Sequence, residues 1–161
     1  MTIRIIQTLL LLLASAAGSA LADHSEEFAP IVQIFSGLAY GDQELVKQAI
    51  TPDFLLLEMG EVWDREFLLT LVQPNSRERS NYFSVISVNR FEGATLINYW
   101  NKATIITDGK ESTRAWLESA VAVQTAAGWK LQQMHSTRIK PEQIPEDVEL
   151  ELLMMDRAVK D

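Results

Sequence analysis

Apolar positions recur first at helical spacing and later at every second residue. In the first half, Phe28, Ile31 and Phe35 follow the period of an amphipathic helix, which predicts a helix over Ser25–Tyr40. Gly41 comes directly after this segment and is a typical residue for ending a helix. This half also predicts two shorter helices, Gln43–Ala49 and Arg65–Val72, with Asp42 and Asp64 as their N-caps. One short strand is predicted over Phe54–Met59.

In the second half, apolar and polar residues alternate, which is the pattern of strands with one buried face. Asp108-Gly109 is a strong signal for a hairpin turn between two of these strands. The predicted strands, which form a four-stranded antiparallel meander, lie around Phe83–Val88 and over Thr95–Ile106, Thr113–Gln124 and Trp129–Ile139. Helices followed by a meander predict an α+β fold, with the helices packed on one face of a curved sheet.

Both ends of the chain differ from this central domain at 23–140. Residues 1–22 combine Arg4, an apolar run and the sequence Ala20-Leu21-Ala22, as in a secretory signal peptide. The run is shorter than the roughly 20 residues of a membrane span. We therefore expect cleavage after Ala22 and a periplasmic or secreted protein, with an uncleaved anchor as the alternative. At the other end, 141–161, the pattern of Glu146–Val159 predicts an amphipathic helix that packs on its own domain or clasps a second subunit.

Composition narrows the classes of function. The formal net charge is −8, without any cluster of lysine and arginine, so binding to nucleic acid is not expected. The chain has no cysteine and two histidines, which is a poor ligand set for a transition metal. No glycine-rich phosphate loop follows a predicted strand, so we expect no nucleotide or other cofactor.

Four segments resemble the nuclear-transport-factor-2-like (NTF2-like) superfamily. They are LAYGD at 38–42, TPDF at 51–54, the G-x-x-W-D step at 60–64, and the terminal strands with W…ES…GWKL…HST. The superfamily includes ketosteroid isomerases, SnoaL-type polyketide cyclases and the association domain of calmodulin-dependent kinase. The resemblance implies a cone-shaped half-barrel with a pocket at its open end. Dimerisation through the sheet is common in this superfamily, so we expect a homodimer. Because the fold has many functions, the resemblance does not select one activity.

Candidate site residues follow from which strand faces point into the cone. Alternation places Arg114, Trp116 and Glu118 on one face of the third long strand. This set either points inward, as a cation and a carboxylate beside an aromatic wall, or faces solvent while the apolar set forms the core. The resemblance supports an inward Arg114, because the kinase association domain has a similar T-R-x-W step. Further ligand-binding candidates are Tyr99, Trp63 and Arg138.

His135 is the one imidazole available for proton transfer beyond the extreme N-terminus, and Glu118 lies on a neighbouring predicted strand. Glu58 is a further candidate base if it is buried. Two functions therefore remain open. The first is a module that binds a small apolar or aromatic-acid ligand, or that assembles, without turnover. The second is a cofactor-free isomerase, cyclase or dehydratase in which His135 and Glu118 transfer protons and Tyr99 or Arg114 polarises a carbonyl group.

Overall fold

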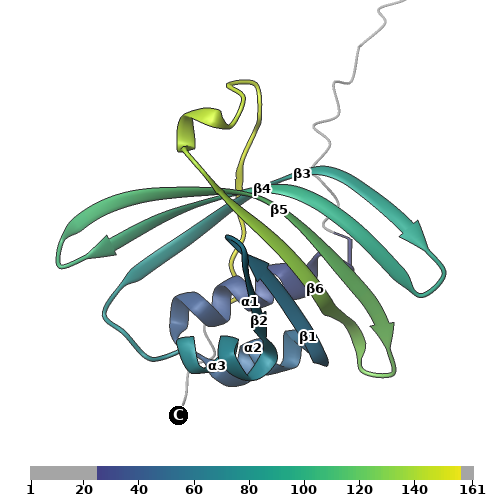
Figure 1. Ribbon diagram of the computed structural model, residues 1–161. Helices are drawn as coiled ribbons and strands as arrows, with labels where there is room; N and C mark the ends of the chain where they lie inside the picture. Colours follow the sequence, from purple (N-terminus) through teal and green to yellow (C-terminus); the bar gives the residue numbers. More distant parts are fainter. Residues whose placement is uncertain (1–24, 157–161) are drawn as a thin grey trace, which may run out of the picture.

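The computed structural model describes residues 25–156, so the predicted signal peptide lies outside the described residues. Three helices lie against the concave face of a curved sheet (Figure 1). No described helix is long and apolar enough to span a membrane. The helices are α1 (Ala29–Tyr40), α2 (Gln43–Ala49) and α3 (Arg65–Leu71), and a short 3-10 helix η1 covers Pro141–Gln143. The strands are β1 (Ile50–Glu58), β2 (Glu61–Asp64), β3 (Glu78–Phe91), β4 (Ala94–Thr107), β5 (Lys110–Thr125), β6 (Gly128–Ile139) and β7 (Glu151–Leu152).

The strand order across the sheet is β2-β1-β6-β5-β4-β3-β7. The predicted antiparallel meander is present in β3 to β6, and the α+β half-barrel is confirmed. The sheet as a whole is mixed, because β1 runs parallel to β6. Strand β2, which the pattern did not predict, pairs with β1 and places Trp63 beside Leu56.

The ends of the helices follow local chemistry. Helix α1 ends at Gly41, whose φ of 65° is in the left-handed region, and a Cβ there would come within 2.5 Å of the Gln73 carbonyl oxygen. Glycine is therefore required at this position. Asp42 and Asp64 accept hydrogen bonds from the first backbone N–H groups of α2 and α3, as predicted. Helix α1 starts at Ala29, later than the predicted Ser25.

The core lies between the helices and the inner face of the sheet. The buried face of α1, which includes Ile31, Ile34 and Phe35, packs on this layer. From the sheet, Phe83 and Tyr99 meet α1, and their ring centroids are 6.1 Å apart. This layer therefore joins α1 to the inner face of the sheet.

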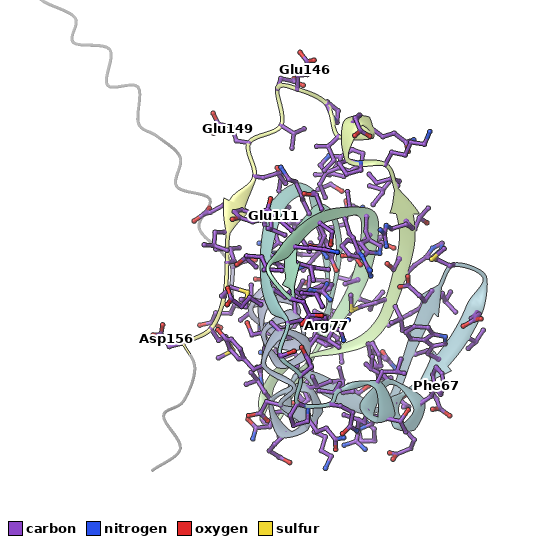
Figure 2. The ribbon with its side chains drawn as sticks, turned by 90° about the vertical axis from the view of Figure 1, so that its left-hand side faces the viewer. Phe67, Arg77, Glu111, Glu146, Glu149 and Asp156 are labelled. Atoms are coloured by element: carbon purple, nitrogen blue, oxygen red, sulfur yellow. The ribbon has the colours of Figure 1, made fainter. Side chains whose placement is uncertain are left out.

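The predicted C-terminal helix at Glu146–Val159 is wrong for its described part, which is extended and includes the short strand β7. The tail runs along the sheet edge at β3 towards Asp156 (Figure 2). Its backbone continues to α1, where the Met155 N–H donates to the Ser36 hydroxyl group at 2.9 Å. The free backbone groups of an edge strand compete with helix formation for this segment, and here they determine its conformation.

Candidate functional site

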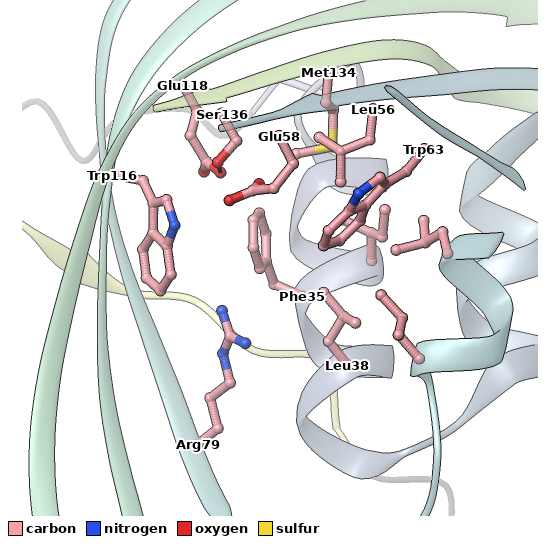
Figure 3. Close-up of a pocket in the computed structure, with 13 residues that line it drawn as sticks. Phe35, Leu38, Leu56, Glu58, Trp63, Arg79, Trp116, Glu118, Met134 and Ser136 are labelled. Carbon is pink, nitrogen blue, oxygen red and sulfur yellow. Dashed lines mark hydrogen bonds between the residues drawn. The ribbon is translucent and has the colours of Figure 1, made fainter. Parts of the chain in front are cut away.

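The inner face of the sheet and helices α1 and α3 enclose a cavity of about 190 Å³ (Figure 3). Most of its wall is apolar, with two carboxyl groups, a hydroxyl group and a guanidinium group among the lining residues. The full lining is Ile34, Phe35, Leu38, Leu56, Glu58, Trp63, Leu68, Leu71, Arg79, Trp116, Glu118, Met134 and Ser136. A cavity of about 150 Å³ is large enough for benzene, so this one suits a single substituted ring.

Strand alternation explains which groups reach the cavity. On β5, Trp116 and Glu118 are 9% and 4% exposed, whereas Leu117 between them is 39% exposed on the outer face. The inward orientation is therefore observed for Trp116 and Glu118, and not for Arg114. Arg114 lies farther along the same strand and is exposed, at a neighbouring cavity.

A row of hydrogen-bonded polar side chains crosses the inner face from β3 to β6. The Arg79 Nε donates to Asn81 Oδ1 at 2.9 Å, and Asn81 Nδ2 donates to Asn101 Oδ1 at 2.8 Å. Asn101 Nδ2 then donates to Glu118 Oε2 at 2.9 Å, and the Ser136 hydroxyl group donates to Glu118 Oε1 at 2.9 Å. Each amide in the row uses both its donor and its acceptor, which fixes its orientation. The row therefore holds the Glu118 carboxyl group in one position beneath the cavity.

Burial dominates the electrostatics of the two carboxyl groups. Burial raises the pKa of Glu118 to about 7, although the hydrogen bonds from Asn101 and Ser136 act in the opposite direction. Burial also raises the pKa of Glu58, which is partly exposed and lies at the cavity wall on β1. Ser136 faces both groups and partly offsets the rise at Glu58.

The cationic groups lie against aromatic rings. The Arg79 guanidinium carbon is 5.6 Å from the ring centroids of both Phe35 and Trp116, and that of Arg138 is 4.9 Å from Trp116. Burial lowers the pKa of Arg79 to about 10, so the side chain stays charged at neutral pH. Both guanidinium groups thus lie against the Trp116 ring.

A second cavity of about 180 Å³ adjoins the first and shares Leu38, Leu71 and Arg79 with it. Arg77 and Arg114 contribute further positive charge to its lining. Both lower the pKa of Arg79 through electrostatic repulsion. The first cavity therefore has two carboxyl groups and one arginine in its lining, whereas the second has three arginines and no carboxyl group.

The predicted His135–Glu118 contact is wrong. The structure pairs His135 with Ser119 and pairs Glu118 with Ser136. Because successive residues of a strand point to opposite faces, His135 is exposed on the outer face while Glu118 is buried on the inner one. The two residues do lie on neighbouring strands, as predicted, but the register places their side chains on opposite faces of the sheet.

Tyr99 lies beneath the cavity and not in its lining. The ring is completely buried and packs edge-on against Phe28 at 5.6 Å. Tyr99 pairs with Glu118 across β4 and β5, and burial together with this carboxyl group raises the pKa of the Tyr99 hydroxyl group. Tyr99 therefore does not reach a ligand in the cavity as it is shaped here.

Trp63, a predicted ligand-binding residue, and Glu58, a predicted candidate base, both line the cavity. The Trp63 indole N–H donates to Glu61 Oε2 at 2.8 Å, and this bond orients the ring. Arg138 does not line the cavity, but its guanidinium group lies over the ring of Trp116, which does.

Sequence reasoning missed Arg79, Asn81, Asn101 and Ser136. Asn101 had a detectable signal, since it is a polar residue on the otherwise apolar inner face of β4. Arg79 lies outside the strand predicted around Phe83–Val88, because the start of β3 has no apolar alternation. Within residues 25–156, no group of three histidine or acidic side chains is arranged to hold a metal ion.

Comparisons with known proteins support the fold. Neither the protein-family models nor the curated proteins gave a match. Among solved structures, the CaMKII hub homology domain of Chlamydomonas reinhardtii superposes with a TM-score of 0.63 at 18% identity, covering 71% of this chain and 97% of that one.

Two other solved structures have the same architecture. A ketosteroid isomerase-like protein from Erwinia carotovora atroseptica gives a TM-score of 0.58 at 16% identity, covering 77% of this chain and 99% of its own. An NTF2-like superfamily protein from Salmonella enterica gives 0.57 at 14% identity, covering 73% and 92%. The chain therefore has the nuclear-transport-factor-2-like fold.

Proposed function

We propose that this protein is an exported binding module that holds a small aromatic or apolar acid in its cone without turning it over. The observation that carries the proposal is the apolar cavity of about 190 Å³ with the Arg79 guanidinium group in its wall. Apolar walls with a few placed polar groups are typical of sites for small molecules. A guanidinium group that faces such a wall suits a carboxylate, which it can bind through two hydrogen bonds.

The charge at the site supports an anionic ligand in spite of the acidic chain. Three more arginines, Arg77, Arg114 and Arg138, lie close enough to Arg79 to lower its pKa. In residues 25–156 none of these four arginines forms an ion pair with a carboxylate within 4.0 Å. The ligand's acid group would supply a direct ion pair to a guanidinium group that Glu118 stabilises only at longer range.

Binding of 4-methylbenzoate, measured by isothermal titration calorimetry, tests this proposal. We expect Arg79→Gln to weaken binding by about 10-fold or more, since a hydrogen bond to a charged group contributes about 1.5–3 kcal/mol. Lys110→Gln, which removes one positive charge from the exposed turn between β4 and β5, is the matched control and should bind as the wild type does. Equal affinity in wild type and Arg79→Gln would contradict the proposed site.

Proton-transfer catalysis is the second candidate, and one observation favours it. Glu118, whose pKa is raised to about 7, lies beside Glu58 in the same cavity. Carboxyl groups tuned in this way serve as general acids and bases. Ketone probes with exchangeable α-protons, followed by NMR in deuterated water, separate the two functions. Exchange that is lost in Glu118→Gln would favour the enzyme, and no exchange would favour the binding module.

Export and assembly are part of the same proposal. The sequence of residues 1–22 supports export, and intact-mass measurement of the secreted protein should show cleavage before Asp23. The exposed Leu117 on the outer sheet face, and the hub domains among proteins of this fold, support association of two copies through that face. Retention of residues 1–22, or a monomer at high concentration, would contradict these parts.

A further inference from the structure

The cone contains charges of opposite sign that do not pair with each other. Glu58 and Glu118 lie at one end of the first cavity, and Arg79 lies at the other, where the second cavity begins. Figure 3 shows the Glu58 carboxyl group and the Arg79 guanidinium group on opposite sides of the Phe35 ring. In the part of the chain that the structure describes, neither carboxyl group has an ion pair within 4.0 Å.

Partly buried charges without partners are costly, because burial removes water from them. Arg79 contacts two aromatic faces and the amide of Asn81, and the Glu118 carboxyl group favours its charged form from beyond ion-pair distance. A monovalent acid that binds at Arg79 would leave the carboxyl groups at the other end unmatched. A ligand that carries both charges would match both ends.

The two carboxyl groups differ in how readily they can accept a hydrogen bond from a ligand. Each oxygen of Glu118 already accepts a hydrogen bond, from Asn101 or from Ser136, and the side chain is 4% exposed. Glu58 is more accessible, and its carboxyl group points into the cavity beside Ser136 (Figure 3). Glu58 is therefore the group that can accept a new donor from a ligand.

We propose that the ligand is a short, rigid amino acid whose acid group lies towards Arg79 and whose ammonium group is bound by Glu58. The aromatic walls of Phe35 and Trp116 fit a ring between the two charged groups. This inference rests on the proposed binding function and adds the ligand class. It makes Glu58 the residue that determines specificity.

Three probes of nearly equal size test the inference by calorimetry. They are 4-(aminomethyl)benzoate, which carries both charges, 4-methylbenzoate, which carries the acid alone, and 4-methylbenzylamine, which carries the amine alone. We expect the first to bind the wild type at least 10-fold more tightly than either of the others. In Glu58→Gln this ratio should fall to about one, while binding of 4-methylbenzoate stays the same or improves.

The control variant is Glu66→Gln, an exposed carboxyl group on α3 outside the cavity, which should keep the wild-type ratio. Binding of 4-methylbenzoate without any gain from the amine would overturn this inference and leave the proposed function intact. No binding of any probe would overturn both. If the preference for 4-(aminomethyl)benzoate over the other probes is kept in Glu58→Gln but lost in Glu118→Gln, the assignment of the ammonium site to Glu58 is overturned.

Discussion

The two faces of the same sheet have opposite chemistry. On the inner face, a polar row that includes Asn101 and Glu118 is buried among apolar side chains. On the outer face, Leu117 and His135 are exposed, although each is next in sequence to a buried polar residue of the inner face. The comparison shows that polarity along a strand does not indicate exposure. A polar residue can be buried where its neighbours on the next strands satisfy its hydrogen bonds.

The largest expected effect comes from interrupting the inner row. Asn101→Ala removes the donor to Glu118 and the acceptor for Asn81, and so leaves two buried groups without a partner. We expect the free energy of unfolding to fall by about 2–5 kcal/mol, since each unsatisfied buried group costs about 1–3 kcal/mol. Urea denaturation measures this change.

The matched outer variant is Asn98→Ala, which removes a hydrogen bond of 2.9 Å to the Ser87 hydroxyl group on the partly exposed face. It should cost about 1 kcal/mol or less, because water can replace the lost partner. Similar losses for the two variants would contradict the contrast between the faces.

The second effect concerns pH. The pKa of Glu118 is raised from the ordinary 4.5 of a glutamate to about 7 in the folded protein, so the folded state binds more protons than the unfolded state between these values. Stability from this group is therefore full below about pH 4.5 and is lost as pH rises towards 7, by on the order of 3 kcal/mol. In Glu118→Gln this component of the pH dependence should be absent. A variant whose unfolding free energy falls with pH as steeply as that of the wild type would refute the assignment.

The third effect is on association through the outer face. Leu117→Asp places a charge at the proposed contact between two copies and should shift sedimentation towards the monomer by about 10-fold or more in dissociation constant, because an unpaired charge in an interface is costly. Glu111→Lys, a charge change near the β4–β5 turn and in the exposed part of β5, serves as the control. Unchanged association of Leu117→Asp would exclude this face.

The smallest expected effect is at His135. Because the side chain is exposed on the outer face, His135→Gln should change the free energy of unfolding by no more than about 0.5 kcal/mol. Affinity for 4-methylbenzoate should be unchanged by calorimetry. A loss of probe binding in this variant would contradict this expectation and show that a change on the outer face affects binding in the cavity.

Much of the fold could be predicted from the sequence, because local signals agreed with the tertiary structure. The helix caps Asp42 and Asp64 and the turn at Asp108-Gly109 formed as expected. The C-terminal segment was not predicted correctly. Its sequence has the pattern of a helix, but in the structure it pairs with the free edge of β3. Because this edge forms only when the sheet is assembled, the sequence of the segment alone does not indicate the pairing.

The site was less predictable, because it depends on register between strands. Trp116, Glu118 and Trp63 were identified from alternation and resemblance, and all three line the cavity. The partner of Glu118 was misassigned, since a shift of one residue exchanges His135 for Ser136. Alternation within one strand predicts which side chains share a face of the sheet. It does not predict which residues of the neighbouring strand lie beside them.

The indole N–H resonances of the four tryptophans test the central claim, that the inner cavity binds a small acid, most directly. In a titration of the ¹⁵N-labelled protein with 4-methylbenzoate, the resonances of Trp63 and Trp116 should shift together and saturate. Those of Trp100 and Trp129, which do not line the cavity, should stay in place. Shifts at Trp100 without shifts at Trp116, or no shifts at millimolar probe, would contradict the account.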